Sequence, residues 1–181
     1  MAFAQNDIEL TPQPPENLAG RWFKNCEGGS VKIEDFTPSE VTLNEIFFLD
    51  SKCTRPSLVF VSEGPYIIPA KGIIDFQFSS VRIRLMSEIA VNDFNTRKVC
   101  GFSDWKWSED KEISGRPCEI FFVGLPQRVP AAGEMRYGIY LLEGNRLSLG
   151  KMTREQNATS PEKRPTELQP RAYTKMPRIR P

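Results

Sequence analysis

Short runs of alternating hydrophobic and polar residues, separated by Gly, Pro, Asn and Asp, extend from Arg21 to about Met152. The clearest run lies at residues 81–85, where Val, Ile and Leu alternate with two Arg residues. A period of two residues is typical of a β-strand with one buried and one solvated face. No long stretch repeats its hydrophobic residues every 3.6 positions, so the pattern predicts an all-β protein.

About eight strands with mostly sequential, antiparallel connections are expected. Tight turns are favoured at Thr37–Glu40 and at Glu143–Asn145. At Ser79–Ser80 the hydrophobic residues shift from even-numbered to odd-numbered positions, which indicates a bulge or bend. Residues 87–96 fit either a short helix or a loop. An up-and-down barrel leaves no exposed sheet edge, so we predict an antiparallel, up-and-down, eight-stranded, lipocalin-like barrel. After a first strand at Arg21, the runs are 31–36, 41–49, 58–61, 73–86, 99–107, 119–123, 135–142 and 146–152.

Polar, Pro-containing segments flank the predicted barrel domain, which spans residues 17–152. Residues 1–16 end in a Pro-rich stretch and are expected to form an extended leader. Ala2 and Ala4 fit the end of a removed secretory signal, although an ordinary cytosolic N-terminus remains an alternative. Residues 153–181 are interpreted as a Pro-rich basic tail that packs on the barrel or on a partner.

Charge is balanced overall but segregated along the chain. The 181 residues carry 24 basic and 23 acidic side chains, a net charge of +1, so we expect no nucleic-acid partner. From residue 161 onward there are six basic and two acidic residues, a net charge of +4, which leaves −3 for the rest. The tail either stays solvated or docks on an acidic partner surface through its basic residues, which are Lys163, Arg164, Arg171, Lys175, Arg178 and Arg180.

The chain contains no histidine. This excludes Ser-His and Cys-His nucleophile pairs and imidazole zinc sites, so the protein is expected to be non-enzymatic, with no cofactor and no metal. No Cys-x-x-Cys pair suggests a zinc site either. No run of eighteen apolar residues predicts a transmembrane segment.

The four cysteines fit two disulfides in an oxidising compartment. Cys26 and Cys53 are equidistant from the turn at Ser39 and Glu40, and Cys100 and Cys118 are equidistant from Glu109. Positions equidistant from a hairpin turn lie opposite each other within disulfide reach. We therefore predict the pairs Cys26–Cys53 and Cys100–Cys118.

The tripeptide Gly20-Arg21-Trp22 resembles the Gly-x-Trp signature of lipocalins and other calycins. The resemblance implies that Gly20 closes a turn and that Trp22 plugs the closed end of the barrel, covered by an arginine that could be Arg154 or Arg171.

A tighter resemblance, which spans most of the chain, is to small secreted bacterial proteins of unknown function. It rests on this first strand together with Asp50–Pro56, Cys100–Trp105 and Arg164–Leu168. It implies an eight-stranded lipocalin-like barrel located in the bacterial periplasm or secreted.

A barrel of eight strands is either filled by side chains or holds one small ligand. The leading hypothesis is an envelope protein that binds a small hydrophobic ligand, although aromatic stripes of this kind also occur as ordinary core. The alternative is an accessory structural subunit of a periplasmic or membrane-associated complex that grips protein partners with its termini. The candidate ligand-binding residues are Trp105, Trp107, Phe76, Phe78, Tyr137 and Ile139.

Overall fold

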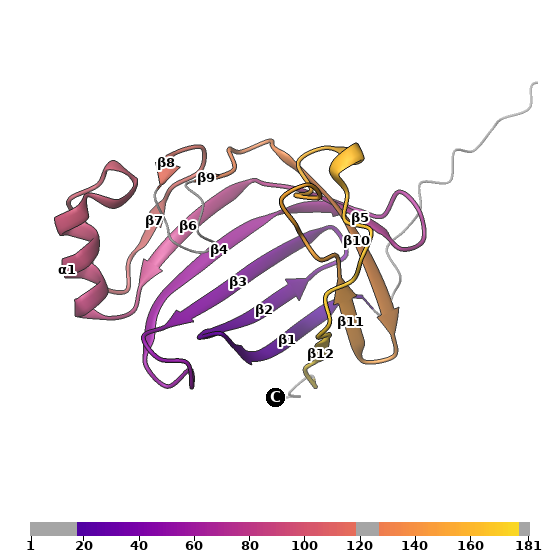
Figure 1. The fold of residues 1–181 in the computed structure, drawn as a ribbon, viewed down its shortest axis with the longest axis horizontal. Helices are drawn as coiled ribbons and strands as arrows, with labels where there is room; N and C mark the ends of the chain where they lie inside the picture. The colour runs from indigo at the N-terminus through magenta and orange to yellow at the C-terminus, as the bar shows by residue number, and fades with distance from the viewer. Residues whose placement is uncertain (1–17, 119–126, 178–181) are drawn as a thin grey trace, which may run out of the picture.

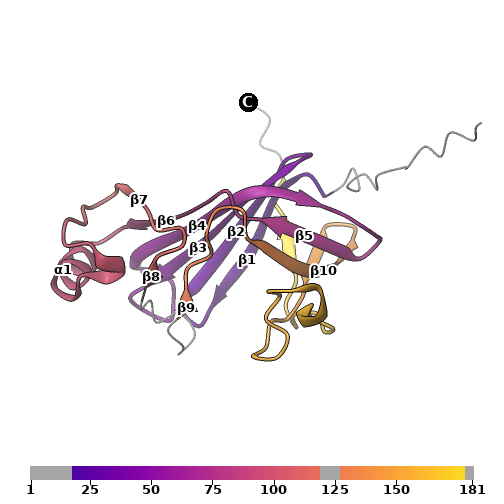
Figure 2. The same ribbon diagram turned by 90° about the horizontal axis from the view of Figure 1, so that it is seen from above.

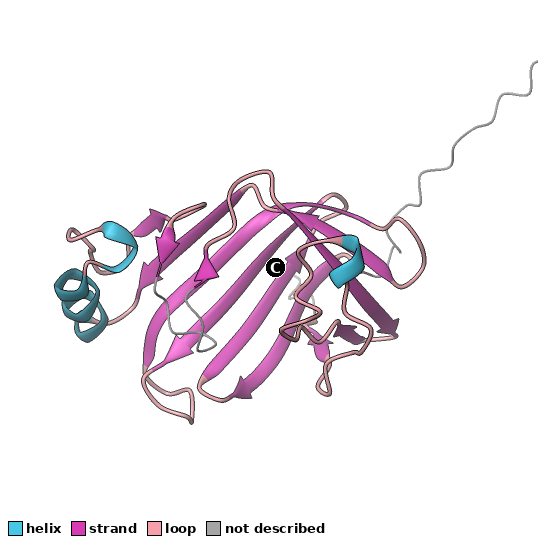
Figure 3. Ribbon diagram, turned by 45° about the horizontal axis from the view of Figure 1, so that its top comes forward, coloured by secondary structure: helices cyan, strands magenta, loops and turns pink. Residues whose placement is uncertain are grey.

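The computed structural model of the chain describes residues 18–118 and 127–177 (Figure 1). The leader at 1–16, the strand expected at 119–123, and Arg178 and Arg180 lie outside these residues. Strands dominate the fold, and the helices are short (Figure 3). The strands are β1 (Gly20–Glu27), β2 (Ser30–Phe36), β3 (Glu40–Phe48), β4 (Pro56–Ile67), β5 (Ile73–Gln77), β6 (Ser80–Leu85), β7 (Asp110–Glu112), β8 (Pro117–Cys118), β9 (Gln127–Arg128), β10 (Met135–Glu143), β11 (Arg146–Leu149) and β12 (Tyr173–Lys175). The helices are α1 (Glu88–Arg97) and two 3-10 turns at Val99–Gly101 and Pro161–Lys163.

Eight strands form a closed antiparallel barrel in the order β1, β2, β3, β4, β5, β10, β11, β12. The ring closes where Trp22 of β1 pairs with Lys175 of β12. This confirms the predicted all-β barrel. The chain order departs from a simple meander, because β6 to β9 and α1 are inserted between the neighbouring strands β5 and β10.

The twelve-residue strand β4 pairs with β3 along one edge and with two different strands along the other. Its first half, Leu58–Glu63, pairs with β6, whereas Tyr66 and Ile67 pair with β5. The chain bends at the predicted position, between β5 and β6, so the run at 73–86 forms two strands. Gly64 lies where β4 passes from one partner to the other, and a Cβ there would come within 1.9 Å of the Gln77 carbonyl oxygen.

The eighth strand of the barrel comes from the C-terminal tail. Tyr173–Lys175 inserts between β1 and β11, and Tyr173 is buried. The boundary expected at residue 152 therefore does not separate the barrel from the tail. A three-residue strand within a Pro-rich stretch has too few residues to show an alternating pattern.

The strand predicted at 99–107 is wrong. Lys98, Cys100 and Gly101 have positive φ angles of 51°, 55° and 79°, which an extended strand does not allow. Residues 99–101 form a 3-10 turn and Trp105 packs edge-on against Phe94 of α1.

The segment left open at 87–96 forms the helix α1. Its N-cap, Ser87, accepts a hydrogen bond from the Ala90 amide. Figure 2 shows α1 at the opposite end of the molecule from the loop between β11 and β12.

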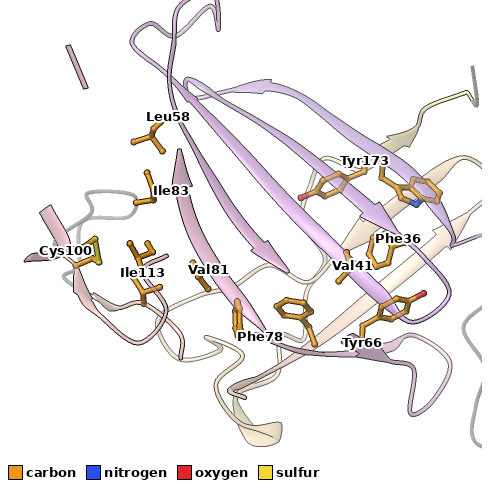
Figure 4. Packing of buried hydrophobic residues seen from close by; sticks show 14 of the residues in the cluster. Phe36, Val41, Leu58, Tyr66, Phe78, Val81, Ile83, Cys100, Ile113 and Tyr173 are labelled. Atoms are coloured by element: carbon orange, nitrogen blue, oxygen red, sulfur yellow. A yellow bond between two sulfur atoms is a disulfide. The ribbon is translucent and has the colours of Figure 1, made fainter. Parts of the chain in front are cut away.

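One hydrophobic core runs through the barrel and beneath α1. Figure 4 shows it extending from Leu58 and Ile83 through Phe78 to Phe36 and Tyr66. Phe36 and Tyr66 meet edge to face, with ring centroids 5.3 Å apart. A cavity adjoins this row and is lined by core residues that include Phe36, Val41, Phe76 and Phe78.

Candidate functional site

A cavity of about 350 Å³ opens within the barrel, and we refer to it as the barrel cavity. Its volume lies at the lower end of the roughly 300 to 1,000 Å³ of small-molecule sites. Seven of the eight barrel strands, all except β1, contribute to it, together with Phe78, Pro130 and the loop that follows β11. The lining residues are Lys32, Glu34, Phe36, Val41, Leu43, Asn44, Glu45, Phe60, Ser62, Ile74, Phe76, Phe78, Pro130, Arg136, Tyr137, Gly138, Ile139, Leu149, Gly150, Met152, Ala158, Pro165, Gln169 and Tyr173.

Four of the six predicted ligand-binding residues line this cavity: Phe76, Phe78, Tyr137 and Ile139. Trp105 and Trp107 do not, and this part of the prediction is corrected. Trp105 is 2 % exposed and packs beneath α1, whereas Trp107 is 61 % exposed. Their strand does not form, so their spacing of two residues does not place them on one face.

Trp22 is fully buried, and its Nε1 donates a hydrogen bond to the Leu18 carbonyl at 2.7 Å. The cation over its ring is Lys175, with Nζ 5.0 Å from the ring centroid, rather than Arg154 or Arg171. Lys175 reaches the ring because β12 pairs directly with β1 at Trp22.

Gly20 has a φ angle of 128°, which favours glycine, and a Cβ there would meet Lys175 Cε at 3.0 Å. Glycine therefore leaves room for the lysine that covers Trp22.

Both predicted disulfides are present. The Cα atoms of Cys26 and Cys53 are 6.0 Å apart, and those of Cys100 and Cys118 are 4.3 Å apart. The first bond joins the end of β1 to the loop after β3, and the second joins the 3-10 turn at 99–101 to β8. Neither bond links facing positions of a single hairpin.

The lysines on the inner side of the first two strands are paired. Lys32 Nζ lies 3.2 Å from Glu45 Oε2 on β3. Lys24 Nζ donates to Gln169 Oε1 at 2.9 Å and lies 3.4 Å from Glu27 Oε2. Of these side chains, Lys32 and Glu45 line the cavity and form an ion pair there.

Glu34 lies on β2, lines the cavity and is only 5 % exposed. Tyr173, which also lines the cavity, is the neighbouring side chain whose hydroxyl group acts on this carboxyl group. The Oε2 atom of Glu34 has no hydrogen-bond partner in the described part of the chain. Burial raises the pKa of Glu34 to about 7, against smaller opposing effects of Tyr173, Lys32 and Lys24. Burial, and secondly the neighbouring carboxyl group, raises the pKa of Tyr173.

We expect this buried carboxyl group to make stability decline with rising pH. The pKa of Glu34 is about 7 in the folded protein and 4.5 ordinarily, so its contribution is full below pH 4.5 and lost as the pH passes 7. The loss amounts to about 3 kcal/mol. Urea unfolding from pH 4 to 8 should show the decline, and Glu34→Gln should remove it. Asp35→Asn, on the other face of β2, should preserve it, and equal pH profiles for wild type and Glu34→Gln would refute the assignment.

The basic tail residues fall into two groups. Arg164 Nη1 contacts Asp75 Oδ1 at 2.5 Å and the Gly138 carbonyl at 2.6 Å, and its guanidinium lies over the ring of Tyr137. Arg164 and Lys175 therefore make contacts within the barrel. Lys163 is exposed, and Arg171 is exposed with its Nε 3.6 Å from Glu27 Oε1.

The polar residues of the cavity were missed by the sequence interpretation. On β2 the side chains that line it are Lys32, Glu34 and Phe36. Phe36 could have indicated that this face of β2 is the inner one. It lies at every second position with Lys32 and Glu34, so all three side chains are on the same face of the strand.

The described residues contain no cluster of three or more His, Cys, Asp or Glu side chains suited to a metal ion. Among the same residues, no helix has the length and apolar character needed to cross a bilayer. The chain matches no protein-family model and no curated protein. Fold and site together define a closed antiparallel barrel of eight strands with an internal cavity, an architecture consistent with a lipocalin-like fold.

Proposed function

We propose that this protein binds one small, mostly apolar molecule in the barrel cavity, without catalysing its conversion. The observation that carries the proposal is the cavity of about 350 Å³, lined by residues of every barrel strand except β1. A barrel filled by side chains would lack this space.

The lining suits such a ligand. Aromatic and aliphatic side chains, including Phe36, Leu43, Phe60, Phe76 and Leu149, supply apolar walls. A small number of polar groups among them would fix the orientation of a bound molecule, as in most small-molecule sites.

We place this activity in the bacterial periplasm or outside the cell. Both disulfides support this location, because such bonds persist in oxidising compartments and are rare in the cytosol.

The alternative, an accessory subunit that grips partners with its tail, has less support. Arg164 is paired with Asp75, and Lys175 lies over Trp22, so two of the six basic residues serve the barrel itself. The cavity has no evident purpose in a purely structural subunit.

Filling the cavity should weaken binding. We expect wild-type protein to bind pyrene, an apolar fluorophore whose emission reports the polarity of its surroundings, and Leu43→Trp to weaken that binding at least about tenfold. Leu43 lines the cavity and is the residue of β3 that pairs with Glu34 of β2, so an indole at this position would occupy the space of the ligand. Fluorescence titration gives both affinities.

Thr42→Trp is the matched control, because Thr42 is the neighbouring residue of β3 and does not line the cavity. This variant should bind pyrene as wild type does. Wild-type protein that leaves pyrene emission unchanged, or a Leu43→Trp variant that binds pyrene normally, would contradict the proposed function.

A further inference from the structure

We propose that the barrel cavity selects ligands carrying a primary amine, whose ammonium group is bound by the carboxylate of Glu34. This inference rests on the proposed function and adds the chemical class of the ligand.

The first observation is an acceptor atom without a donor. Glu34 is 95 % buried and lines the cavity together with Tyr173. Its Oε2 has no hydrogen-bond partner among residues 18–118 and 127–177. Leaving a buried carboxylate oxygen unsatisfied costs free energy, and a donor supplied by the ligand would recover it.

The second observation is the pairing of the neighbouring charges. Lys32 is bound to Glu45, and Lys24 is bound to Gln169 and Glu27. Glu34 forms no salt bridge within the described part of the chain. It is therefore the cavity carboxylate that lacks a cation, and an ammonium group supplies both the charge and the hydrogen bond.

Aromatic residues around the same space favour this choice over a neutral donor. Phe36, Phe60 and Tyr173 line the cavity along with Glu34. Aromatic faces attract cations, and the attraction is strongest where water is excluded. Arg136 also lines the cavity, with its guanidinium 5.2 Å from the centre of the Phe78 ring and Nη1 donating to the Met135 carbonyl.

The site should be sensitive to pH. The groups that act on Glu34 are Lys24 from β1, Lys32 from β2, Glu45 from β3 and Tyr173 from β12. Because the pKa of Glu34 is about 7, an ammonium ligand must displace a proton at lower pH. Its affinity should therefore be level above pH 7 and fall by up to about tenfold per pH unit below it.

Three ligands with the same alkyl chain test the proposal: octylamine, 1-octanol and octanoate. Calorimetry at pH 8 should show wild-type protein binding octylamine at least about tenfold more tightly than either of the others. Between pH 8 and pH 6 the affinity for octylamine should fall severalfold, whereas that for 1-octanol should not change. Octylamine itself stays protonated in this range, as a lysine side chain does.

Substitution of Glu34 should remove the selectivity. In Glu34→Gln, octylamine and 1-octanol should bind with similar affinity, and the pH dependence for octylamine should vanish. Asp35→Asn is the matched control, since Asp35 lies on the same strand, pairs with Arg21 and does not line the cavity. It should preserve both the preference and the pH dependence.

The outcomes separate the two proposals. Binding of pyrene by wild-type protein without any preference for octylamine would overturn amine selection while the cavity function stands. A preference retained in Glu34→Gln would overturn the role of Glu34. If Glu34→Gln does not fold, the pH series on wild-type protein decides, because affinity for octylamine that is level from pH 8 to 6 contradicts the proposal. Failure of pyrene and all three octyl compounds to bind would overturn both.

Discussion

Gly64→Ala is expected to lower the free energy of unfolding by more than about 4 kcal/mol, which is beyond the usual range for one methyl group. A Cβ at this position would lie 1.9 Å from the Gln77 carbonyl oxygen and 2.8 Å from the Ser79 amide nitrogen. Both are backbone atoms, so no side-chain rotation can relieve the clash. Urea unfolding followed by circular dichroism measures the loss.

The expected loss is large because Gly64 lies at the point where β4 changes partners. The Ser79 amide donates to the Glu63 carbonyl at 2.8 Å, which holds the chain against β4 between β5 and β6. Moving this segment away would break pairing on both sides of the bend.

Gly138→Ala is the matched comparison, because Gly138 is also a strand glycine without a positive φ angle. Its Cβ would approach the Ile74 carbonyl oxygen to only 3.1 Å, so a shift of a few tenths of an ångström suffices. It should cost much less than Gly64→Ala. Equal stability of the two variants would contradict the close approach of the Gln77 and Ser79 backbone to Gly64.

Arg164→Met should destabilise the protein by about 3 to 5 kcal/mol, because it leaves a buried carboxylate without its cation. The side chains of Arg164 and Asp75 are 19 % and 9 % exposed, and Nη1 also binds the Gly138 carbonyl. The residue joins the loop after β11 to β5 and β10. Urea unfolding measures the stability, and amide exchange at Tyr137, which donates to the Ala158 carbonyl, reports release of the loop.

Two variants test whether this loss comes from the ion pair. Lys163→Met removes the adjacent but exposed charge and should change stability by less than about 0.5 kcal/mol. Adding Asp75→Leu to Arg164→Met should restore part of the lost stability, since no buried charge then remains. A double variant as unstable as the sum of the single ones would contradict the ion-pair explanation.

These contacts connect the tail with the site. Pro165 and Gln169 line the cavity, and Tyr173 both closes the barrel and engages Glu34. The C-terminal segment that looked like an appendage in the sequence therefore forms part of the wall of the candidate binding site.

Strands with clear patterns were predicted well. The hairpin at Glu143–Asn145, the alternating run of β6 and the bend before it all follow from residues close together in the chain. Local preferences of Gly and Asn for turns, and alternation along a strand, need no knowledge of distant segments.

The disulfide pairs were predicted correctly, but for an incomplete reason. Cys26 is not on the hairpin of β2 and β3, and Cys100 and Cys118 are not on a hairpin at Glu109. The first pair forms because the end of β1 and the loop after β3 lie at the same end of the barrel. In this case symmetry in the sequence coincided with proximity in space.

The sequence by itself determined the all-β class and most strand positions, because these follow from residue periodicity and turn chemistry. Only the tertiary structure decided that Tyr173–Lys175 closes the barrel, that Trp105 and Trp107 do not line the cavity, and that Glu34 does. On β2, Val31 and Ile33 alternate with Lys32 and Glu34, so hydrophobicity alone would have placed the charged residues outside. Which face is inside depends on how eight strands close, and that is set by contacts between residues far apart in the chain.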